Sequence, residues 1–253
     1  MRFLLPLPAD RPAQRWTMLL GGLALYGVSS GLIVRAGLGL DPWDVLHQGL
    51  ARTFGGQVGT WAILASVGVL LLWLPLRSRF GVGTLANAVL VGLGINATVW
   101  LVPAPPGLVV RTGVLVAGVA LNGVATGLYI GAGLGPGPRD GLTTSIAARG
   151  HSIRLVRTVI EAAVLVGGWL LGGSVGIGTV LYALAIGPLT HKTIPWLAIR
   201  RPGEAPRRQV QPALAEVEPA AGGVHVHGVG QPGRRDQPEV DRLPAVGEVG
   251  QCQ

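Results

Sequence analysis

The sequence predicts an all-α integral membrane protein, a polytopic helix bundle with six transmembrane helices arranged as two inverted three-helix repeats. Three observations carry this prediction: a low content of charge, six long apolar segments, and a duplication of the first half. Of the 253 residues, 49% are apolar and 13% are charged, against roughly 25% charged in a typical soluble domain. Because a charge inside the hydrocarbon costs about 3 kcal/mol, a chain that crosses a bilayer confines charges to the ends of its spans.

Six apolar segments, each bounded by charge, proline or tryptophan, approach the length of about 20 residues that a membrane crossing needs. The sixth is interrupted by Pro188, His191 and Lys192, which a kinked helix with its lysine at the interface accommodates. Six of the seven tryptophans, Trp73 among them, fall near segment ends, as an interfacial aromatic belt predicts. The segments are residues 16–34, 58–76, 81–102, 112–130, 155–172 and 177–199.

The second half of the chain repeats the first with a shift of 96 residues. Between Gly22–Ala51 and Gly118–Ala147, 15 of 30 positions are identical without a gap. Further along, residues 81–84 recur as residues 176–179 after one deletion. Because each copy holds an odd number of spans, the second copy is turned upside down, which is the plan of many secondary transporters.

The distribution of basic residues predicts the orientation. With the amino terminus inside, the segments on that side hold 14 Lys and Arg residues, and the opposite side holds 3. The positive-inside rule therefore puts both termini in the cytoplasm. The expected divisions are a cytoplasmic tail (1–15), membrane repeat 1 (16–102), membrane repeat 2 (112–199) and a disordered cytoplasmic tail (203–253) that contains six prolines and no aromatic residue.

Several functional classes are not supported by the sequence. The net charge of +8 does not predict nucleic-acid binding, because the arginines cluster between apolar spans without interleaved aromatic residues. Cys252 is the single cysteine, so neither an intramolecular disulfide nor a cysteine metal site can form. We expect no metal, no cofactor and no catalytic residue, since no nucleophile elbow, zinc motif or phosphate-binding lysine motif appears.

A glycine-rich segment follows the first span of each copy. Pro42 and Pro138 are each followed two residues later by an aspartate, Asp44 or Asp140, a pattern that predicts the first turn of a helix. Both helices are too short to cross the bilayer, so they either lie at the interface or dip back into the bundle. These segments are residues 41–54 and 138–150.

Two interpretations of these segments stay open. The aspartates cap the helix and complement its dipole, a contribution of about 0.3–1 kcal/mol each. Alternatively, the glycine run lets the backbone approach a ligand at which the helix amino terminus is aimed. The candidate binding residues are Gly37, Gly39, Asp44, Gly133, Gly135, Arg139 and Asp140.

Glu161 is the one acid well inside a predicted span, and Arg157 precedes it by one helical turn, so the two can pair. They are either solute- or ion-binding residues that face the bundle interior, or a structural ion pair near the headgroups. Asn122, like two other asparagines within spans, is expected to form hydrogen bonds between helices, with contact to a substrate as the alternative. His47 has no ligand-spaced partner, and we expect it at the surface or interface.

The segments Gly37–Gly49, Tyr129–Gly141 and Arg154–Glu161 resemble the YczE-type branch of the YczE/YyaS/YitT family of bacterial membrane proteins. The resemblance covers about residues 16–199 and leaves out the carboxy-terminal tail. It implies a multi-pass plasma-membrane protein, and it supplies no catalytic residues to carry over.

Two functions follow from these observations. The first is a secondary transporter or exporter of a small solute, with Glu161 and Arg157 as coupling or binding residues and the glycine segments along the path. Its inverted architecture predicts that positions 44 and 140 are accessible from opposite faces of the membrane. The second is a non-transporting accessory protein that supports another membrane complex through a membrane-protein partner or a homo-oligomer. A membrane enzyme is a third alternative, which no motif proposes.

Overall fold

The structure is a computed structural model that describes residue 5, residues 7–76 and residues 80–199. Within these residues the chain forms eight α-helices and no β-strand, which confirms the predicted all-α class. The predicted tail at 203–253 lies outside the described residues, as do Arg77 and Arg79 of a predicted cytoplasmic loop. The helices are α1 (Pro12–Ala36), α2 (Pro42–Phe54), α3 (Val58–Leu76), α4 (Val82–Leu101), α5 (Gly107–Gly131), α6 (Pro138–Ala147), α7 (Ile153–Leu170) and α8 (Ile177–Leu197).

Four helices in the described part of the chain are long and apolar enough to cross a membrane, judged by length and composition. They are α1, α3, α4 and α5, and they overlap the first four predicted spans. The other two predicted spans correspond to α7 and α8, which do not meet this criterion, so the count of six stays a prediction. α7 carries Arg154, Arg157 and Glu161 within its 18 residues, whereas α8 continues through Pro188.

The two short helices begin at Pro42 and Pro138, as predicted. Their 13 and 10 residues correspond to about 20 and 15 Å, which is less than the roughly 30 Å of the hydrocarbon core. Asp41 caps α2, because its Oδ1 accepts the backbone N–H groups two and three residues further on, at 3.0 and 3.2 Å. Gly137 precedes α6 and offers no side chain for the same purpose.

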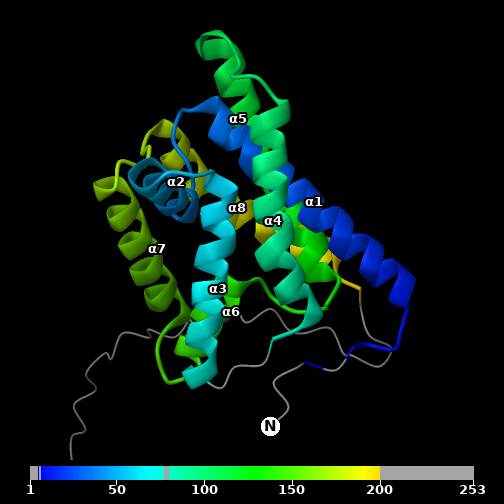
Figure 1. Ribbon diagram of the computed structural model, residues 1–253. Helices are drawn as coiled ribbons and strands as arrows, with labels where there is room; N and C mark the ends of the chain where they lie inside the picture. The colour runs from blue at the N-terminus through cyan, green and yellow to red at the C-terminus, as the bar shows by residue number, and fades with distance from the viewer. Residues whose placement is uncertain (1–4, 6, 77–79, 200–253) are drawn as a thin grey trace, which may run out of the picture. The chain divides into compact units, whose positions relative to one another are not determined.

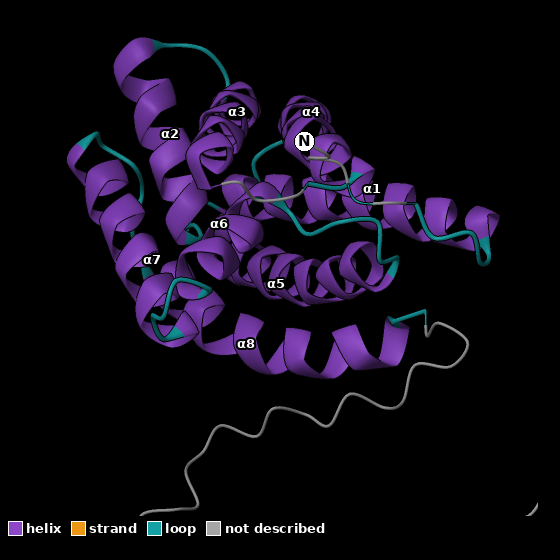
Figure 2. Cartoon of the chain, turned by 90° about the horizontal axis from the view of Figure 1, so that it is seen from below, coloured by secondary structure: helices purple, strands orange, loops and turns teal. Residues whose placement is uncertain are grey.

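Helices of the two copies interleave (Figures 1 and 2). α1 and α5 lie side by side, with α4 packed against α1 and α8 packed against α5. The remaining helices pair across the copies, since α2 packs against α7 and α3 packs against α6. Residues of both copies therefore build one compact unit rather than two separate halves.

Two arginines that the 96-residue shift relates tie α1 and α5 together at opposite ends. Near the start of α1, Arg15 donates from Nη1 to the carbonyl oxygen of Ala132 at 2.7 Å. Near the start of α5, Arg111 donates to the carbonyl oxygens of Ala36 and Gly37, each at 2.7 Å. The last carbonyls of a helix lack partners and carry partial negative charge, so a guanidinium is a favourable donor there. It follows that α1 and α5 run antiparallel.

The loops after α1 and α5 make a second pair of matched contacts. At the start of α4, the N–H of Gly83 donates to the carbonyl oxygen of Leu134 at 3.0 Å. At the start of α8, the N–H of Gly178 donates to the carbonyl oxygen of Leu38 at 2.8 Å. Each loop therefore holds the first turn of the last helix of the other copy.

Trp73 departs from the expected interfacial belt. Its side chain is 1% exposed and packs against Gly141 of α6, where an added Cβ would overlap the indole ring. Trp169, its counterpart in the second copy, is 61% exposed, as a belt residue should be. The prediction that Trp73 lies at the membrane interface, made from its proximity to a span end, was therefore wrong, because the packing of α3 on α6 buries its side chain.

Candidate functional site

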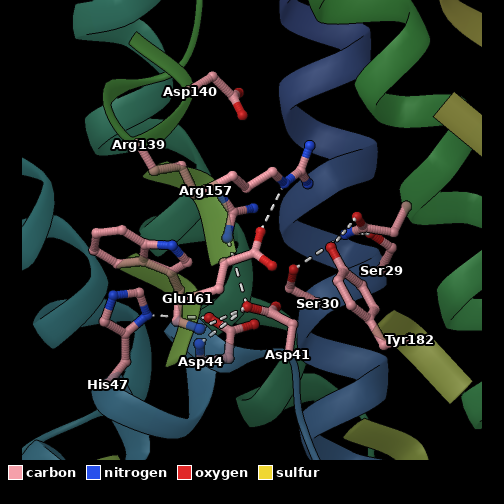
Figure 3. Close-up of polar contacts among 12 residues, drawn as sticks. Ser29, Ser30, Asp41, Asp44, His47, Arg139, Asp140, Arg157, Glu161 and Tyr182 are labelled. Carbon is pink, nitrogen blue, oxygen red and sulfur yellow. Dashed lines mark hydrogen bonds and ion pairs between the residues drawn. The ribbon is translucent and has the colours of Figure 1, made fainter. Parts of the chain in front are cut away.

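A cavity of about 450 Å³ lies among six helices, α1, α2, α5, α6, α7 and α8. The amino-terminal ends of α2 and α6 both contribute to its wall, through Asp41 and Arg139 respectively. Figure 3 shows how the polar side chains gather there. The polar and aromatic wall residues include Tyr26, Asp41, Trp43, Tyr129, Arg139, Asp140, Arg157, Glu161 and Tyr182.

Arg139, the second residue of α6, reaches the start of α2. Its Nη1 lies 3.5 Å from Oδ1 of Asp41, which is within ion-pair distance. Its guanidinium carbon also lies 5.3 Å from the centre of the Tyr26 ring, a cation–π contact. The Asp41 side chain is buried and the Arg139 side chain is partly exposed. One ion pair at the cavity wall therefore joins the two copies.

A smaller pocket of about 40 Å³ adjoins this wall and receives Asp44 and His47 of α2. Nδ1 of His47 lies 3.1 Å from Oδ1 of Asp44, and both residues are buried. Burial raises the pKa of Asp44 to about 6, although hydrogen bonding from Asp41 and Ser30 opposes the shift. Burial also lowers the pKa of His47 to about 4. Near neutral pH an ionised carboxylate therefore stands beside a neutral imidazole.

Asp140 is held by a phenol from the neighbouring helix. The hydroxyl of Tyr129 on α5 donates to Oδ2 of Asp140 at 2.6 Å, and Asp140 is half-buried. The matching aspartate of the first copy, Asp44, is buried beside a histidine instead. Two residues that the repeat relates therefore have different partners and face different parts of the site.

A polar network lies behind the cavity and joins three long helices. The amide nitrogen of Asn122 on α5 donates to the hydroxyls of Ser29 and Ser30 on α1, at 3.0 and 3.3 Å. The hydroxyl of Tyr182 on α8 donates to the amide oxygen of Asn122 at 3.0 Å. Asn122 thus has the interhelical hydrogen-bonding role that was predicted for it.

Arg157 and Glu161 form the predicted pair on α7, with Nε to Oε1 at 2.8 Å. Both residues contribute to the cavity wall. Their side chains are 55% and 39% exposed, respectively. A solute-binding role and a structural role both remain compatible with this position.

The four predicted glycines lie in the loops after α1 and α5, and in the described part of the chain none of them lines the cavity. All four have positive φ, with Gly39 at 113° and Gly135 at 129°. A Cβ at Gly39 would lie 2.7 Å from the backbone nitrogen of Gly176, and one at Gly135 would lie 2.9 Å from the Cα of Gly81. Gly39 and Gly135 therefore permit close approach between two backbones, whereas Gly37 and Gly133 lie against the side chains of Arg111 and Arg15. A ligand role for the four glycines stays a prediction.

Asp41 and the tyrosines were not singled out from the sequence. The chain holds three tyrosines, and Tyr26, Tyr129 and Tyr182 all line the cavity. The tyrosines could have been predicted as site residues, because a phenol hydroxyl within an apolar span needs a hydrogen-bond partner when it is buried. His47 was wrongly expected at the surface or interface, since it is 7% exposed on a helix that packs against both α3 and α7. No group of three metal-ligating side chains occurs among the described residues.

Comparison with known proteins identifies relatives along most of the chain. Residues 13–194 match the family of unknown function DUF6198. An uncharacterized protein of Haemophilus influenzae is 43% identical over 176 residues, 69% of this chain and 81% of its own length. The uncharacterized membrane protein YczE of Bacillus subtilis is 36% identical over 190 residues, 72% of this chain and 86% of its own. The uncharacterized protein YyaS of Bacillus subtilis is 30% identical over 179 residues, 69% of this chain and 89% of its own.

These relatives confirm the predicted resemblance to the YczE-type branch. No solved structure matches the chain. The membrane protein among the relatives, together with the long apolar helices, identifies an integral membrane protein.

Proposed function

The chain belongs to the family of unknown function DUF6198, and we propose that it is a secondary transporter or exporter of a small solute in the bacterial plasma membrane. The observation that carries this proposal is the polar cavity of about 450 Å³ within a bundle of apolar helices. Ionisable side chains are costly at membrane depth, and those that persist there mark the paths of solutes and ions. Two glycine-flanked short helices at the cavity fit the discontinuous helices of transporters.

We further propose six crossings, by α1, α3, α4, α5, α7 and α8, with the second copy inverted and both termini in the cytoplasm. The reciprocal bonds of Arg15 and Arg111 support this plan, because they link the first helices of the two copies in antiparallel orientation. The matched contacts at the starts of α4 and α8 support it as well. In this plan α2 and α6 enter the bundle from opposite sides and meet at Asp41 and Arg139.

A change of access follows from that meeting point. The amino terminus of each short helix carries partial positive charge, which suits an anionic group of the protein or of a solute. The Asp41–Arg139 pair occupies the junction, so α2 and α6 can part only when this pair is loosened or shared with a solute. Rocking of the short helices against the tied α1–α5 pair would then open one side at a time.

Flux in proteoliposomes tests the proposal. A defined mixture of isotope-labelled amino acids, amines, organic acids and sugars would be offered, and uptake followed by mass spectrometry. We expect uptake of at least one class, abolished by Ala183→Trp, which fills the cavity from α8. Ala120→Trp makes the same change on the exposed face of α5 and should transport normally. A folded protein that moves no class, and that purifies with a stoichiometric membrane partner, would instead establish the accessory role.

Cysteine labelling in cells tests the inverted plan separately. Positions 44 and 140 suit this test poorly, because both lie beside Arg139 at the site. Exposed positions at the far ends of the short helices are better, namely Gln57 after α2 and His151 after α6. With Cys252 replaced by serine, single cysteines at these positions should react with impermeant reagent from opposite sides. Reaction of both from the same side would refute the inversion.

A further inference from the structure

The polar groups of the cavity wall can be divided into those that have partners and those that do not. Arg139 has Asp41 and the Tyr26 ring, and Arg157 has Glu161. Asp140 accepts a hydrogen bond from Tyr129. Neither arginine therefore lacks an anionic partner, since each already contacts a carboxylate.

Asp41 carries the acceptor that is left over. Its Oδ1 accepts two backbone N–H groups of α2 and lies beside Arg139. Its Oδ2 and that of Asp44 are both buried without an N–H or O–H donor among the described residues, and the two carboxyls interact with each other. Of the two, only Asp41 lines the cavity. A buried acceptor in this state is matched by a ligand that brings a donor, either a proton or an N–H group.

The charges and rings of the wall favour a positively charged ligand. Three carboxylates, those of Asp41, Asp140 and Glu161, face two guanidiniums, those of Arg139 and Arg157. With all five groups ionised the net charge is −1, and Asp41 is the most deeply buried of the three carboxylates. Four aromatic side chains also line the cavity, and aromatic faces attract cations. They are Tyr26, Trp43, Tyr129 and Tyr182.

We infer that the cavity binds a protonated amine, which donates an N–H to Oδ2 of Asp41 and takes the place of a proton there. This inference deepens the proposed function, since it names the solute class of the same cavity. Without amine, a protonated Asp41 leaves the wall neutral. With amine, one proton leaves, one cation enters, and the total charge of the site is unchanged. Such an exchange avoids a net charge in a low-dielectric site.

The surroundings of Asp41 suit a carboxyl that exchanges protons. Burial raises its pKa, and the nearby carboxylate of Asp44 raises it further, while His47 opposes the shift. The charged and titratable groups around it come from every neighbouring wall. They are Asp44 and His47 on α2, Tyr26 on α1, Tyr129 on α5, Arg139 and Asp140 on α6, Arg157 and Glu161 on α7, and Tyr182 on α8.

Calorimetry on the purified full-length chain in detergent tests the inference without any need for transport. The probes are benzylammonium and putrescine, with benzyl alcohol as a neutral match and benzoate as an anionic match. We expect at least one amine to bind at millimolar concentration or below, and the two matched compounds not to bind. Titration in buffers of different ionisation enthalpy should show release of about one proton for each amine bound below the pKa of Asp41.

Variants of Asp41 test whether its carboxylate is the one that binds the amine. Asp41→Asn should weaken amine binding at least about tenfold and remove proton release. Asparagine can still cap α2 through its amide oxygen, so an unchanged melting temperature would exclude misfolding as the cause. Asp41→Glu should restore part of the binding. Asp10→Asn removes the same charge at an acid that pairs with Arg15 outside the cavity wall, and it should bind as the wild type does.

Each contrary result overturns the inference. These results are binding of benzoate in preference to amines, failure of both amines to bind, amine binding without proton release, and wild-type affinity in Asp41→Asn. Failure of the proposed function looks different, because amine binding would then persist without flux in proteoliposomes. Flux of another solute class without amine binding would support the transporter proposal and contradict the proposal that the solute is an amine.

Discussion

α2 and α6 occupy matching places in the two copies, yet they build different sites. Asp41 caps α2, whereas Gly137 stands in the same place before α6. Asp44 is buried beside His47, whereas Asp140 is half-buried under the hydroxyl of Tyr129. The short helix of the first copy therefore brings the buried carboxylate of Asp41 to the cavity, and that of the second brings the arginine that faces it.

The framework around these helices is much more alike. Arg15 and Arg111 make the same kind of bond to the end of the opposite helix. Gly39 and Gly135 both have positive φ and lie against the start of a helix in the other copy. The comparison teaches that matched residues such as Arg15 and Arg111 maintain how the helices meet. The two sites differ because Gly137 replaces Asp41 and because the matched aspartates have different partners.

Alanine at Gly39 or Gly135 should have the largest effect on stability. The two substitutions test whether the loops after α1 and α5 contribute equally to the fold. Each change places a Cβ against backbone and forces a left-handed conformation on a residue that resists it. We expect a loss of about 3 kcal/mol or more in the free energy of unfolding for each. Gly172→Ala, with φ of 88° and open space around it, should cost only about 1 kcal/mol. Thermal unfolding in detergent measures the stability of all three variants. If alanine destabilised the protein at only one of Gly39 and Gly135, the two loops would not be equivalent.

Removal of the matched arginines should have an intermediate effect and reveal a difference within the framework. Arg15 is 1% exposed and its bond to Ala132 is buried, whereas Arg111 is half-buried. We expect Arg15→Ala to cost about 3 kcal/mol and Arg111→Ala about 1 kcal/mol, because an unpaired carbonyl costs more where water cannot reach it. The same unfolding measurement decides this, and equal losses would contradict the ranking.

The Asp44–His47 pair should have the smallest effect in the wild type, because the contributions of the two groups to the pH dependence of stability nearly cancel. The folded state raises the pKa of Asp44 to about 6 and lowers that of His47 to about 4. Between these values the carboxyl holds a proton that the imidazole releases, so their contributions to the pH dependence of stability oppose each other. Asp44→Asn should make stability rise more steeply with pH from about 4 to 6.5 than in the wild type. His47→Gln should shift the slope the other way.

Melting temperatures across that range measure the two slopes. Each variant should differ from the wild type by about 1–2 kcal/mol over the window. Asp140→Asn is the matched control in the second copy, where a tyrosine replaces the histidine as partner. Slopes of the same sign in Asp44→Asn and His47→Gln would show that the two groups do not act as a pair.

Local features of the fold were predictable from sequence, because they depend on neighbouring residues. Pro42 and Pro138 predicted the starts of α2 and α6, and four apolar segments predicted four long helices. Hydropathy was less decisive for α7, because Arg154, Arg157 and Glu161 lie within it. The repeat indicated which residues correspond but not that Arg15 and Arg111 bond across it.

The candidate site was predictable only in part. Arg139, Asp140, Arg157 and Glu161 meet at one cavity, which their residue types suggested. Asp41 was missed because a cap residue before a proline has an ordinary local explanation. Trp73 was misplaced for a different reason, because its burial depends on contact with Gly141 of α6, which lies far along the chain. Positions that depend on contact between the two copies cannot be found from one copy alone.

The reciprocal arginine bonds have a consequence for biogenesis. When residues 1–102 have emerged from the ribosome, Ala36 and Gly37 still lack the donor that Arg111 provides. The start of α4 likewise lacks the carbonyl of Leu134. These backbone groups therefore gain their partners only after the second half has been synthesised. We therefore expect the packing of the two copies to be completed together, once α5 and the loop after it have been made.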